Sequence, residues 1–300
     1  MTVELATVSS QSSQLTDRDF QIIATFMYRE TGIVLNESKR AMVVSRLTRR
    51  LRELGLTSFG DYCELIQSRW GSDERARLIC SLTTNVTHFF REPSHFDDLR
   101  ANVFPELLER AQAGQRVRLW SAGCSTGQEV YSLGVSLLAV CPTAADLDIR
   151  ILGTDIDPEV VKTARAGVYT KSQLDQMPAE GRRFFRLDND ISVKVTAGAE
   201  LKRLVAFRVL NLLHDWPVKG PFDVIMCRNV TIYFDRPTQQ RLWHRFSRLI
   251  PEGGRLYVGH SEFRVEDAGT QYNAGTSGVF IRKADEPSSG LEVTGARQPI

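Results

Sequence analysis

Apolar residues between positions 15 and 82 recur every three or four positions, which is the spacing of one face of an α-helix. The first such run has Thr16 as a helix N-cap and continues through Phe20, Ile23 and Met27. Further helices, separated by glycine-containing turns, are expected at about 38–54, 58–69 and 73–82. The pattern predicts a small all-helical N-terminal domain over residues 15–82.

From about residue 94 the chain changes to alternating helix-like and strand-like runs. After a helix expected at 94–113, short apolar runs typical of buried strands occur at 117–120, 148–153, 222–227 and 254–259. Helical runs lie between them at 129–140, 158–166 and 237–250. This alternation predicts a parallel sheet with helices on both faces, so residues 94–284 are expected to form a doubly wound α/β domain.

Residues 184–210 interrupt this alternation. Three short strand-like runs, at 184–186, 191–196 and 204–209, lie too close together for helical crossovers. We expect a small antiparallel insertion that leads into the next main strand. Its edge is either decoration or a place where a bound peptide adds a strand.

Composition narrows the class of protein. The 300 residues are 42% hydrophobic and 25% charged, which fits a globular chain with a core, and the net charge of +2 does not favour nucleic acid. Five widely spaced cysteines without a C-x-x-C pair favour a reducing cytoplasm over a disulfide framework or a zinc site. We recognise no signal peptide, and no apolar run approaches the ~20 residues of a membrane helix, so no membrane insertion is expected. The polar ends, residues 1–14 and 285–300, are expected to be disordered tails.

The helix expected at 38–54 carries a strong local charge. Six basic residues and no acidic residue occur between positions 38 and 52. Lys39, Arg46 and Arg50 are expected opposite the apolar stripe, with Arg49 beside them. Such a face is either a solvated surface or a docking site. No aromatic residues interleave the basic ones, so an acidic protein surface is a better candidate partner than nucleic acid.

Candidate ligand-binding residues follow the ends of the predicted strands. The turn after the first strand contains Gly123 and Gly127 and leads to a helix that begins near Glu129, so its backbone N–H groups can approach a ligand closely. Asp155 ends the next strand, where a carboxylate accepts hydrogen bonds from both ribose hydroxyls. Asp157, which precedes a proline, is expected to be a helix N-cap. These features fit a nicotinamide dinucleotide and S-adenosylmethionine equally.

The segment 83–92 mixes hydrogen-bonding side chains with two adjacent phenylalanines. This mixture is typical either of a hinge or of a linker that packs on one side and offers Asn85, Thr87 and Arg91 to a ligand. Polar residues also follow two later strands, and the amide after the first of these, Asn211, suits hydrogen bonding to an adenine edge. They are Asn211 after the run at 204–209, and Arg228, Asn229 and Tyr233 after the run at 222–227.

Five segments stand out in order along the chain, at 83–92, 122–132, 153–157, 222–235 and 259–262. Together they resemble the signature segments of the CheR family, the chemotaxis-receptor glutamate methyltransferases, and the resemblance extends over about residues 15–283. Members of this family use S-adenosylmethionine to esterify glutamate side chains on the cytoplasmic helical bundles of chemoreceptors. The resemblance implies a class I methyltransferase-type (Rossmann-like) domain with a small β insertion, preceded by an all-helical domain.

The resemblance also implies where the chemistry takes place. Asn85, Thr87 and Arg91 would lie near the methionine part of S-adenosylmethionine and its reacting methyl group, with Tyr233 beside them. A glutamate carboxylate is already ionised at neutral pH, so its methylation needs no general base. Arg91 is expected to orient the substrate carboxylate, and Tyr233 to act as a second donor.

The remaining implied roles concern the rest of the cofactor. Glu129 would hold the amino or sugar portion and Asp155 the ribose, with Gly123 in the turn between them. The adenosine surroundings would be formed by Asn211, Leu212, Arg228 and Asn229.

The chain departs from the family pattern in the turn, where Gln128 and Val130 replace an acid and a proline. A catalytically weakened S-adenosylmethionine-binding signalling module is therefore the alternative. The insertion also lacks the glycine-rich hairpin associated with members that bind a receptor's C-terminal tether peptide. The five histidines form no metal-binding motif, so no metal is expected, and Cys124 and Cys227 are expected to be packing residues.

Overall fold

The computed structural model describes residues 14–187, 193–262, 271–275 and 278–284. Its N-terminal part contains the helices α1 (Asp17–Thr31), α2 (Arg40–Leu54), α3 (Phe59–Gln67) and α4 (Ser72–Leu82). Thr16 accepts a hydrogen bond from the Asp19 N–H and so caps α1, and Gly32 ends that helix with a positive φ of 71°. The prediction of an all-helical N-terminal domain is confirmed. Apart from Gln14, the expected tails at 1–14 and 285–300 lie outside the described residues.

The basic residues of α2 differ in their surroundings. Arg50 binds the buried Glu74 carboxylate, with its closest approach at 2.6 Å, and Arg46 donates to the carbonyl oxygen of Thr83, also at 2.6 Å. Both arginines therefore hold α2 against α4 and its C-terminal end, contrary to the expectation that they line an outer face. The helical spacing could not reveal this, because the partners lie far away in the sequence. Lys39 and Arg49 are exposed, as expected.

A seven-stranded sheet forms the centre of the second domain. Its strands lie in the order β6 (Val205–Val209), β2 (Ile149–Asp155), β1 (Val117–Ala122), β7 (Val224–Cys227), β8 (Arg255–Val258), β10 (Val279–Arg282) and β9 (Tyr272–Ala274). The first five are parallel, whereas β10 pairs antiparallel with both β8 and β9. The sequence pattern did not predict β9 and β10.

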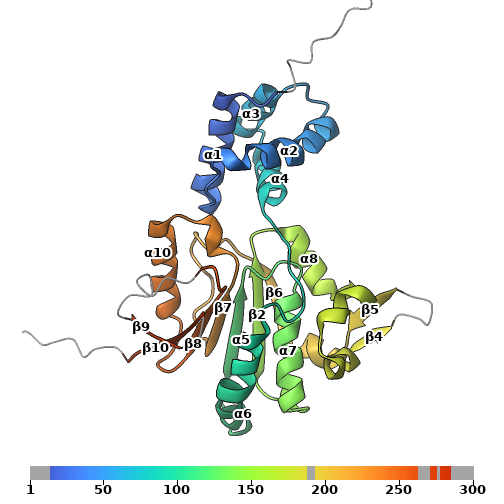
Figure 1. Ribbon diagram of the computed structural model, residues 1–300, viewed down its shortest axis with the longest axis vertical. Coiled ribbons are helices and arrows are strands. Elements are labelled where there is room, and N and C mark those ends of the chain that lie inside the picture. Colours follow the sequence, from blue (N-terminus) through green and yellow to red (C-terminus); the bar gives the residue numbers. More distant parts are fainter. Residues whose placement is uncertain (1–13, 188–192, 263–270, 276–277, 285–300) are drawn as a thin grey trace, which may run out of the picture.

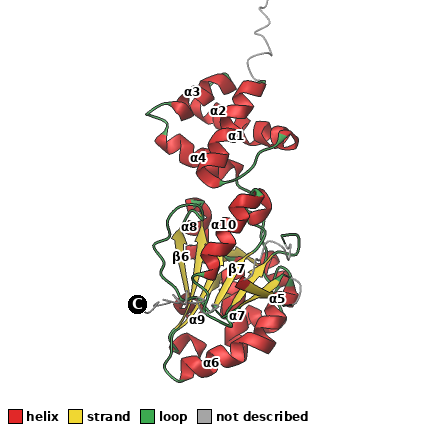
Figure 2. Ribbon diagram, turned by 90° about the vertical axis from the view of Figure 1, so that its left-hand side faces the viewer, coloured by secondary structure: helices red, strands yellow, loops and turns green. Residues whose placement is uncertain are grey.

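Both faces of this sheet are buried, as the predicted doubly wound architecture requires. Along β1, Leu119 packs in one apolar cluster and the adjacent Trp120 in another, because successive side chains of a strand point to opposite faces. One cluster includes α5 (Pro93–Asp98), α6 (Phe104–Gln112), α7 (Gln128–Val140), α8 (Pro158–Ala166) and α9 (Ala199–Leu204), and the other includes α10 (Arg236–Ser247). Figure 2 shows the N-terminal helices above this layered domain. No helix in the described part of the chain is long and apolar enough to cross a membrane.

The helix expected at 94–113 is divided into three parts. A π-helical segment, Leu99–Val103, separates α5 from α6, and the N–H of Phe104 bonds to the carbonyl oxygen of Leu99 five residues earlier. The following residue, Pro105, has no N–H to donate. The expected helix is therefore present, but it contains a π-helical turn that the apolar spacing did not predict.

The antiparallel insertion exists, but its strands differ from those expected. It contains β3 (Val168–Thr170), β4 (Phe185–Leu187) and β5 (Lys194–Ala197), with β5 in the middle. The run at 204–209 instead belongs to the main sheet, where β6 pairs with β2, and β3 was not predicted. The sequence of a short strand does not specify which strand it pairs with, so its assignment to a sheet depends on distant residues. Figure 1 shows this small sheet on the side of the α/β domain away from α10.

The two domains meet beside the carboxyl ends of the parallel strands (Figure 1). The Tyr28 hydroxyl on α1 donates to Asp235 at 2.7 Å, and the Asn211 amide donates to the carbonyl oxygen of Glu30 at 2.7 Å. The N–H of Val34 bonds to the carbonyl oxygen of Tyr233 at 2.9 Å. The end of α1 is thus fixed against the loops that follow β6 and β7.

Candidate functional site

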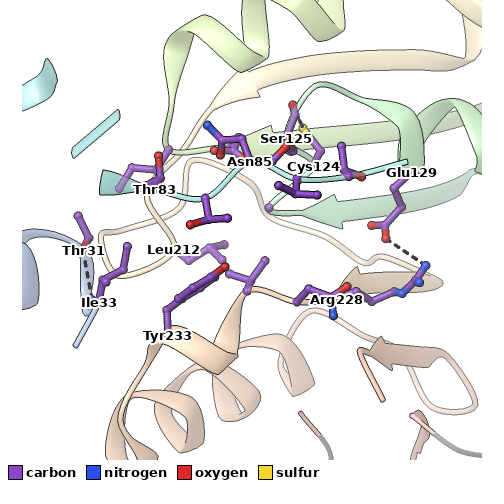
Figure 3. A pocket seen from close by; sticks show the side chains of 18 of the residues that line it. Thr31, Ile33, Thr83, Asn85, Cys124, Ser125, Glu129, Leu212, Arg228 and Tyr233 are labelled. Carbon is purple, nitrogen blue, oxygen red and sulfur yellow. Dashed lines mark hydrogen bonds and ion pairs between the residues drawn. The ribbon is translucent and has the colours of Figure 1, made fainter. Parts of the chain in front are cut away.

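A cavity lies at the carboxyl ends of β1, β2 and β7, where the N-terminal domain covers them (Figure 3). It is open on one side and is lined by residues of both domains and of the segment that joins them. Doubly wound sheets bind ligands at this position, next to the strand where the order reverses. Every predicted cofactor and catalytic residue lines it: Asn85, Thr87, Arg91, Gly123, Glu129, Asp155, Asn211, Leu212, Arg228, Asn229 and Tyr233.

The turn between β1 and α7 needs its glycines. Gly123 has a φ of 89°, and a Cβ at this position would lie 2.2 Å from a methyl carbon of Val230. Gly127 has a φ of 93°, and a Cβ there would lie 2.8 Å from Ala164. Both residues therefore combine a left-handed backbone with close packing, which other residue types do not tolerate. The turn passes tightly along the cavity wall as a result.

Asp155 is held in place by backbone groups at the end of β2. Its carboxylate accepts hydrogen bonds from the N–H of Ser125 at 2.8 Å and from the N–H of Asp157 at 3.0 Å. Burial raises the pKa of Asp155, and these two hydrogen bonds partly oppose the rise. Asp157 accepts from the N–H of Glu159 and so caps α8, as predicted. The Asp157 carboxylate also accepts from the Asn85 amide at 3.0 Å.

Arg228 lies between two acidic side chains at one end of the cavity. Its guanidinium is 3.2 Å from carboxylate oxygens of both Glu92 and Glu129, and its side chain is only 1% exposed. Figure 3 shows the pair with Glu129, whose other oxygen accepts from the Ser121 hydroxyl at 2.8 Å. Burial raises the pKa of Glu129, although Arg228 partly offsets this effect. Arg228 thus links Glu129 in the cavity wall to Glu92 beside the cavity.

The segment 83–93 packs on one side and faces the cavity with the other. Phe89 and Phe90 are buried in the core of the α/β domain, and the N–H of Phe90 bonds to the Ser132 hydroxyl on α7 at 3.0 Å. On the cavity side, the carbonyl oxygen of Asn85 accepts from the Ser125 hydroxyl at 2.8 Å. The Arg91 guanidinium donates to the carbonyl oxygen of Val86 at 3.1 Å. These contacts fit a linker that packs on one side and faces a ligand site on the other better than they fit a simple hinge.

Asn211 and Tyr233 differ in how freely they can meet a ligand. The Asn211 side chain donates to Glu30 and accepts from the N–H of Leu213 at 2.9 Å, so its amide already has structural partners. Its proposed contact with an adenine edge is correspondingly restricted. Tyr233 belongs to the short helix Thr231–Tyr233, and Figure 3 shows its ring directed into the cavity near Leu212.

Several cavity residues were not predicted from the sequence. Thr31 and Ile33 reach the cavity from the end of α1, and Ser125 has a φ of 49° in the glycine turn. Glu92 beside the cavity was not singled out, and neither was Glu262. Both residues lie in segments that carry the family resemblance, 83–92 and 259–262, which was the available signal for them.

Glu92 also belongs to a group of potential metal ligands with His95 and His260. One ligand atom from each lies within 4.8 Å of the others. Arg228 is already 3.2 Å from Glu92, so a divalent cation there would meet an adjacent positive charge. The expected lack of a metal requirement stays a prediction.

The two departures in the turn do not face the cavity. Gln128 is buried and accepts a hydrogen bond from the Thr126 hydroxyl at 2.8 Å. Val130 is fully buried, and a Cβ on Gly153 would lie 2.8 Å from one of its methyl groups. Neither side chain lines the cavity, so both residues contribute to the packing of α7 and not directly to ligand contacts.

The fold and the cavity define a class: α/β proteins that bind a nucleoside-containing cofactor at the reversal point of a parallel sheet. Two family models match, "CheR methyltransferase, all-alpha domain" over residues 18–83 and "CheR methyltransferase, SAM binding domain" over residues 85–277. The chain therefore belongs to the CheR family of chemotaxis methyltransferases and has that family's S-adenosylmethionine-binding domain. This finding confirms the resemblance and decides against a nicotinamide dinucleotide.

Curated relatives agree with this assignment. A probable chemotaxis protein methyltransferase of Rhizobium etli is 48% identical over 79% of this chain and 89% of its own length. Chemotaxis protein methyltransferase 2 of Pseudomonas aeruginosa is 43% identical over 84% of this chain and 89% of its own. The chemotaxis protein methyltransferase of Escherichia coli is 43% identical over 83% and 85%.

Proposed function

We propose that the protein transfers a methyl group from S-adenosylmethionine to glutamate side chains of a chemoreceptor's cytoplasmic helical bundle, forming methyl esters in the cytoplasm. The observation that carries this proposal is the position of Arg91 and Tyr233 in one cavity with Glu129 and Asp155. Acidic residues suit a cationic cofactor that carries a ribose, and Arg91 suits an anionic substrate side chain.

The donor set of the cavity fits S-adenosylmethionine. Asp155 would accept from the ribose hydroxyls, and Glu129 would face the amino group or the sugar. Asn85, Thr87 and Gly123 would line the path of the ligand, while Leu212 and Asn229 would contact the adenosine. When bound, S-adenosylmethionine supplies an electrophilic methyl group on a positively charged sulfur.

The protein's own residues then have to orient and shield the nucleophile. A glutamate carboxylate is ionised at neutral pH, so no residue needs to remove a proton. Arg91 would hold this carboxylate by charge-assisted hydrogen bonds, and Tyr233 would donate a second one. Thr31 and Ile33 help to close the cavity on the side of the N-terminal domain, which limits the access of water. The contribution is mainly alignment of the reacting groups.

The receptor would dock on the N-terminal domain as well as at the cavity. Lys39 and Arg49 are the exposed members of the predicted docking set, whereas Arg46 and Arg50 would act by holding α2 in place. Glutamate-rich receptor helices are acidic, so this charge would favour encounter.

Ester formation is the decisive test. The protein is incubated with methyl-labelled S-adenosylmethionine and receptor cytoplasmic fragments, and alkali is then used to release labelled methanol. We expect Arg91→Ala to lower the rate about 100-fold, by analogy with the loss of one transition-state hydrogen-bond donor, while calorimetry shows retained S-adenosylhomocysteine binding. Arg116→Ala, at an exposed site before β1, is the matched control. A wild-type protein that binds the cofactor but releases no methanol would favour the alternative of a weakened signalling module.

A further inference from the structure

The Glu262 carboxylate binds the backbone of the segment that leads from β7 to Tyr233. Four consecutive N–H groups donate to it, those of Asn229 at 2.5 Å, Val230 at 2.8 Å, Thr231 at 2.6 Å and Ile232 at 3.3 Å. The Thr231 hydroxyl and the Gly259 N–H add bonds of 3.0 and 2.8 Å. Hydrogen bonds to an ionised acceptor are about twice as strong as neutral ones. A single side chain therefore accepts four consecutive backbone N–H groups of this segment.

Two further features show that the arrangement is tightly constrained. Asn229 has a φ of 59°, in the left-handed region that asparagine adopts more readily than most residues other than glycine. Gly259 leaves the space that Glu262 needs, since a Cβ at Gly259 would lie 2.6 Å from a carboxylate oxygen of Glu262. The carboxylate and the bare glycine together set the path of the segment.

We infer that Glu262 is a positioning residue for methyl transfer, because it holds Asn229 and Tyr233 in the cavity wall. Glu262 itself does not line the cavity, whereas Asn229, Val230 and Tyr233 do. It acts through the backbone and has no contact with the reacting groups. The inference rests on the proposed function only for its effect on the reaction rate.

The role requires a carboxylate and not merely a polar side chain of the same size. Both oxygens of Glu262 accept N–H groups, one from Asn229 and Gly259 and the other from Val230 to Ile232. In Glu262→Gln the new NH₂ group would face N–H donors in either orientation of the amide. The segment therefore has to move away from one half of the side chain. Glu262→Asp keeps both acceptors but is one methylene shorter, so it should restore part of the anchoring.

The anchoring is measured directly by hydrogen exchange of the wild-type and variant proteins. In Glu262→Gln, amides 229–232 should exchange at least about tenfold faster, while amides in β1 and β2 keep their protection. Glu252→Gln, an exposed glutamate in the turn before β8, is the matched control and should leave the exchange of 229–232 unchanged. Unchanged protection in Glu262→Gln would overturn the inference, whether or not the protein methylates receptors.

Kinetics then separate positioning from general stability. A displacement of about 1 Å at the reacting groups costs on the order of 100-fold in rate, so kcat of Glu262→Gln should fall by about 10- to 100-fold. Binding of S-adenosylhomocysteine should weaken less than about threefold, because Asp155 at the end of β2 and Glu129 on α7 are not held by Glu262. Glu262→Asp should recover a large part of kcat. If Glu262→Gln does not fold, Gly259→Ala displaces the same carboxylate, and normal kcat and exchange in that variant would overturn the inference.

Discussion

The hydroxyl of Tyr28 donates a 2.7 Å hydrogen bond to the carboxylate of Asp235, which joins the first helix of the N-terminal domain to the N-cap of α10. The hydrogen bond to Asp235 raises the pKa of Tyr28 above its usual value, so the hydroxyl keeps its proton through the neutral range. Tyr233, two residues before Asp235, faces the cavity. The contact between the domains is therefore adjacent to the proposed catalytic residues.

Tyr28→Phe should loosen this contact without unfolding either domain, because Tyr28 lies at the surface. Thr31 and Ile33 form one wall of the cavity, so their greater freedom should weaken S-adenosylhomocysteine binding by about threefold. Calorimetry at pH 7 measures the change. Arg116→Ala, which changes an exposed site away from the cavity, is the control. Tyr272→Phe is unsuitable for this purpose because Tyr272 is buried. Equal affinity of Tyr28→Phe and wild type would contradict a role of the contact in closing the cavity.

Arg50→Ala should destabilise the N-terminal domain strongly. It leaves Glu74, whose side chain is 6% exposed, without its cation, and removing one partner of a buried ion pair costs about 3–5 kcal/mol. Tyr62 also donates to Glu74 at 2.9 Å and cannot replace the charge. Urea unfolding followed by circular dichroism measures the loss. Arg49→Ala breaks only an exposed pair with Glu53 and should change stability by less than about 0.5 kcal/mol.

As the pH is lowered, cofactor affinity should begin to fall at a higher pH than it would if Glu129 had the pKa of an ordinary glutamate. Burial raises the pKa of Glu129 above 4.5, so its carboxylate is protonated, and its attraction for a cationic ligand is lost, at a higher pH. The pKa of Asp155 is also raised by burial and contributes a second titration in the same direction. Binding of S-adenosylmethionine measured from pH 8 down to pH 5 should therefore weaken progressively. Glu129→Gln should bind more weakly at pH 8 and show a smaller pH dependence, whereas Glu109→Gln on the exposed side of α6 should match wild type.

Lys39→Glu combined with Arg49→Glu should slow receptor methylation at low salt. Both residues are exposed, so the reversal of charge acts on encounter with an acidic partner more than on folding. The deficit should shrink in about 0.5 M salt, where charges are screened within a few ångströms. Cofactor affinity, measured in parallel, should not change. A deficit that is independent of salt would contradict electrostatic docking on α2.

The sequence was sufficient for features that are encoded locally. Helical spacing predicted α1 to α4, the caps at Thr16 and Asp157 followed from their neighbours, and strand ends predicted that Asp155 and Arg228 converge. The family resemblance added Leu212, which no chemical property of its own would indicate.

Features that depend on distant partners were missed or misplaced. Arg50 was assigned to an outer face because its charge was visible, while its partner Glu74 lies 24 residues away. The residues of β6 were grouped with the insertion, because nothing within that run specifies pairing with β2. Glu262 acts on a segment about 30 residues earlier, so only the folded chain reveals its hydrogen bonds.

The segment between α4 and α5 is both the covalent connection of the two domains and a wall of the cavity. Connections between domains ordinarily accept inserted sequence, but residues inserted here would displace Asn85 and Arg91 from the cavity. Gly114, in the turn between α6 and β1, is exposed and lies away from the cavity lining, although its φ of 82° requires that the glycine itself be kept. A fluorescent or affinity module inserted directly after Gly114 should therefore preserve cofactor binding, whereas the same module inserted in the segment between α4 and α5 should abolish it.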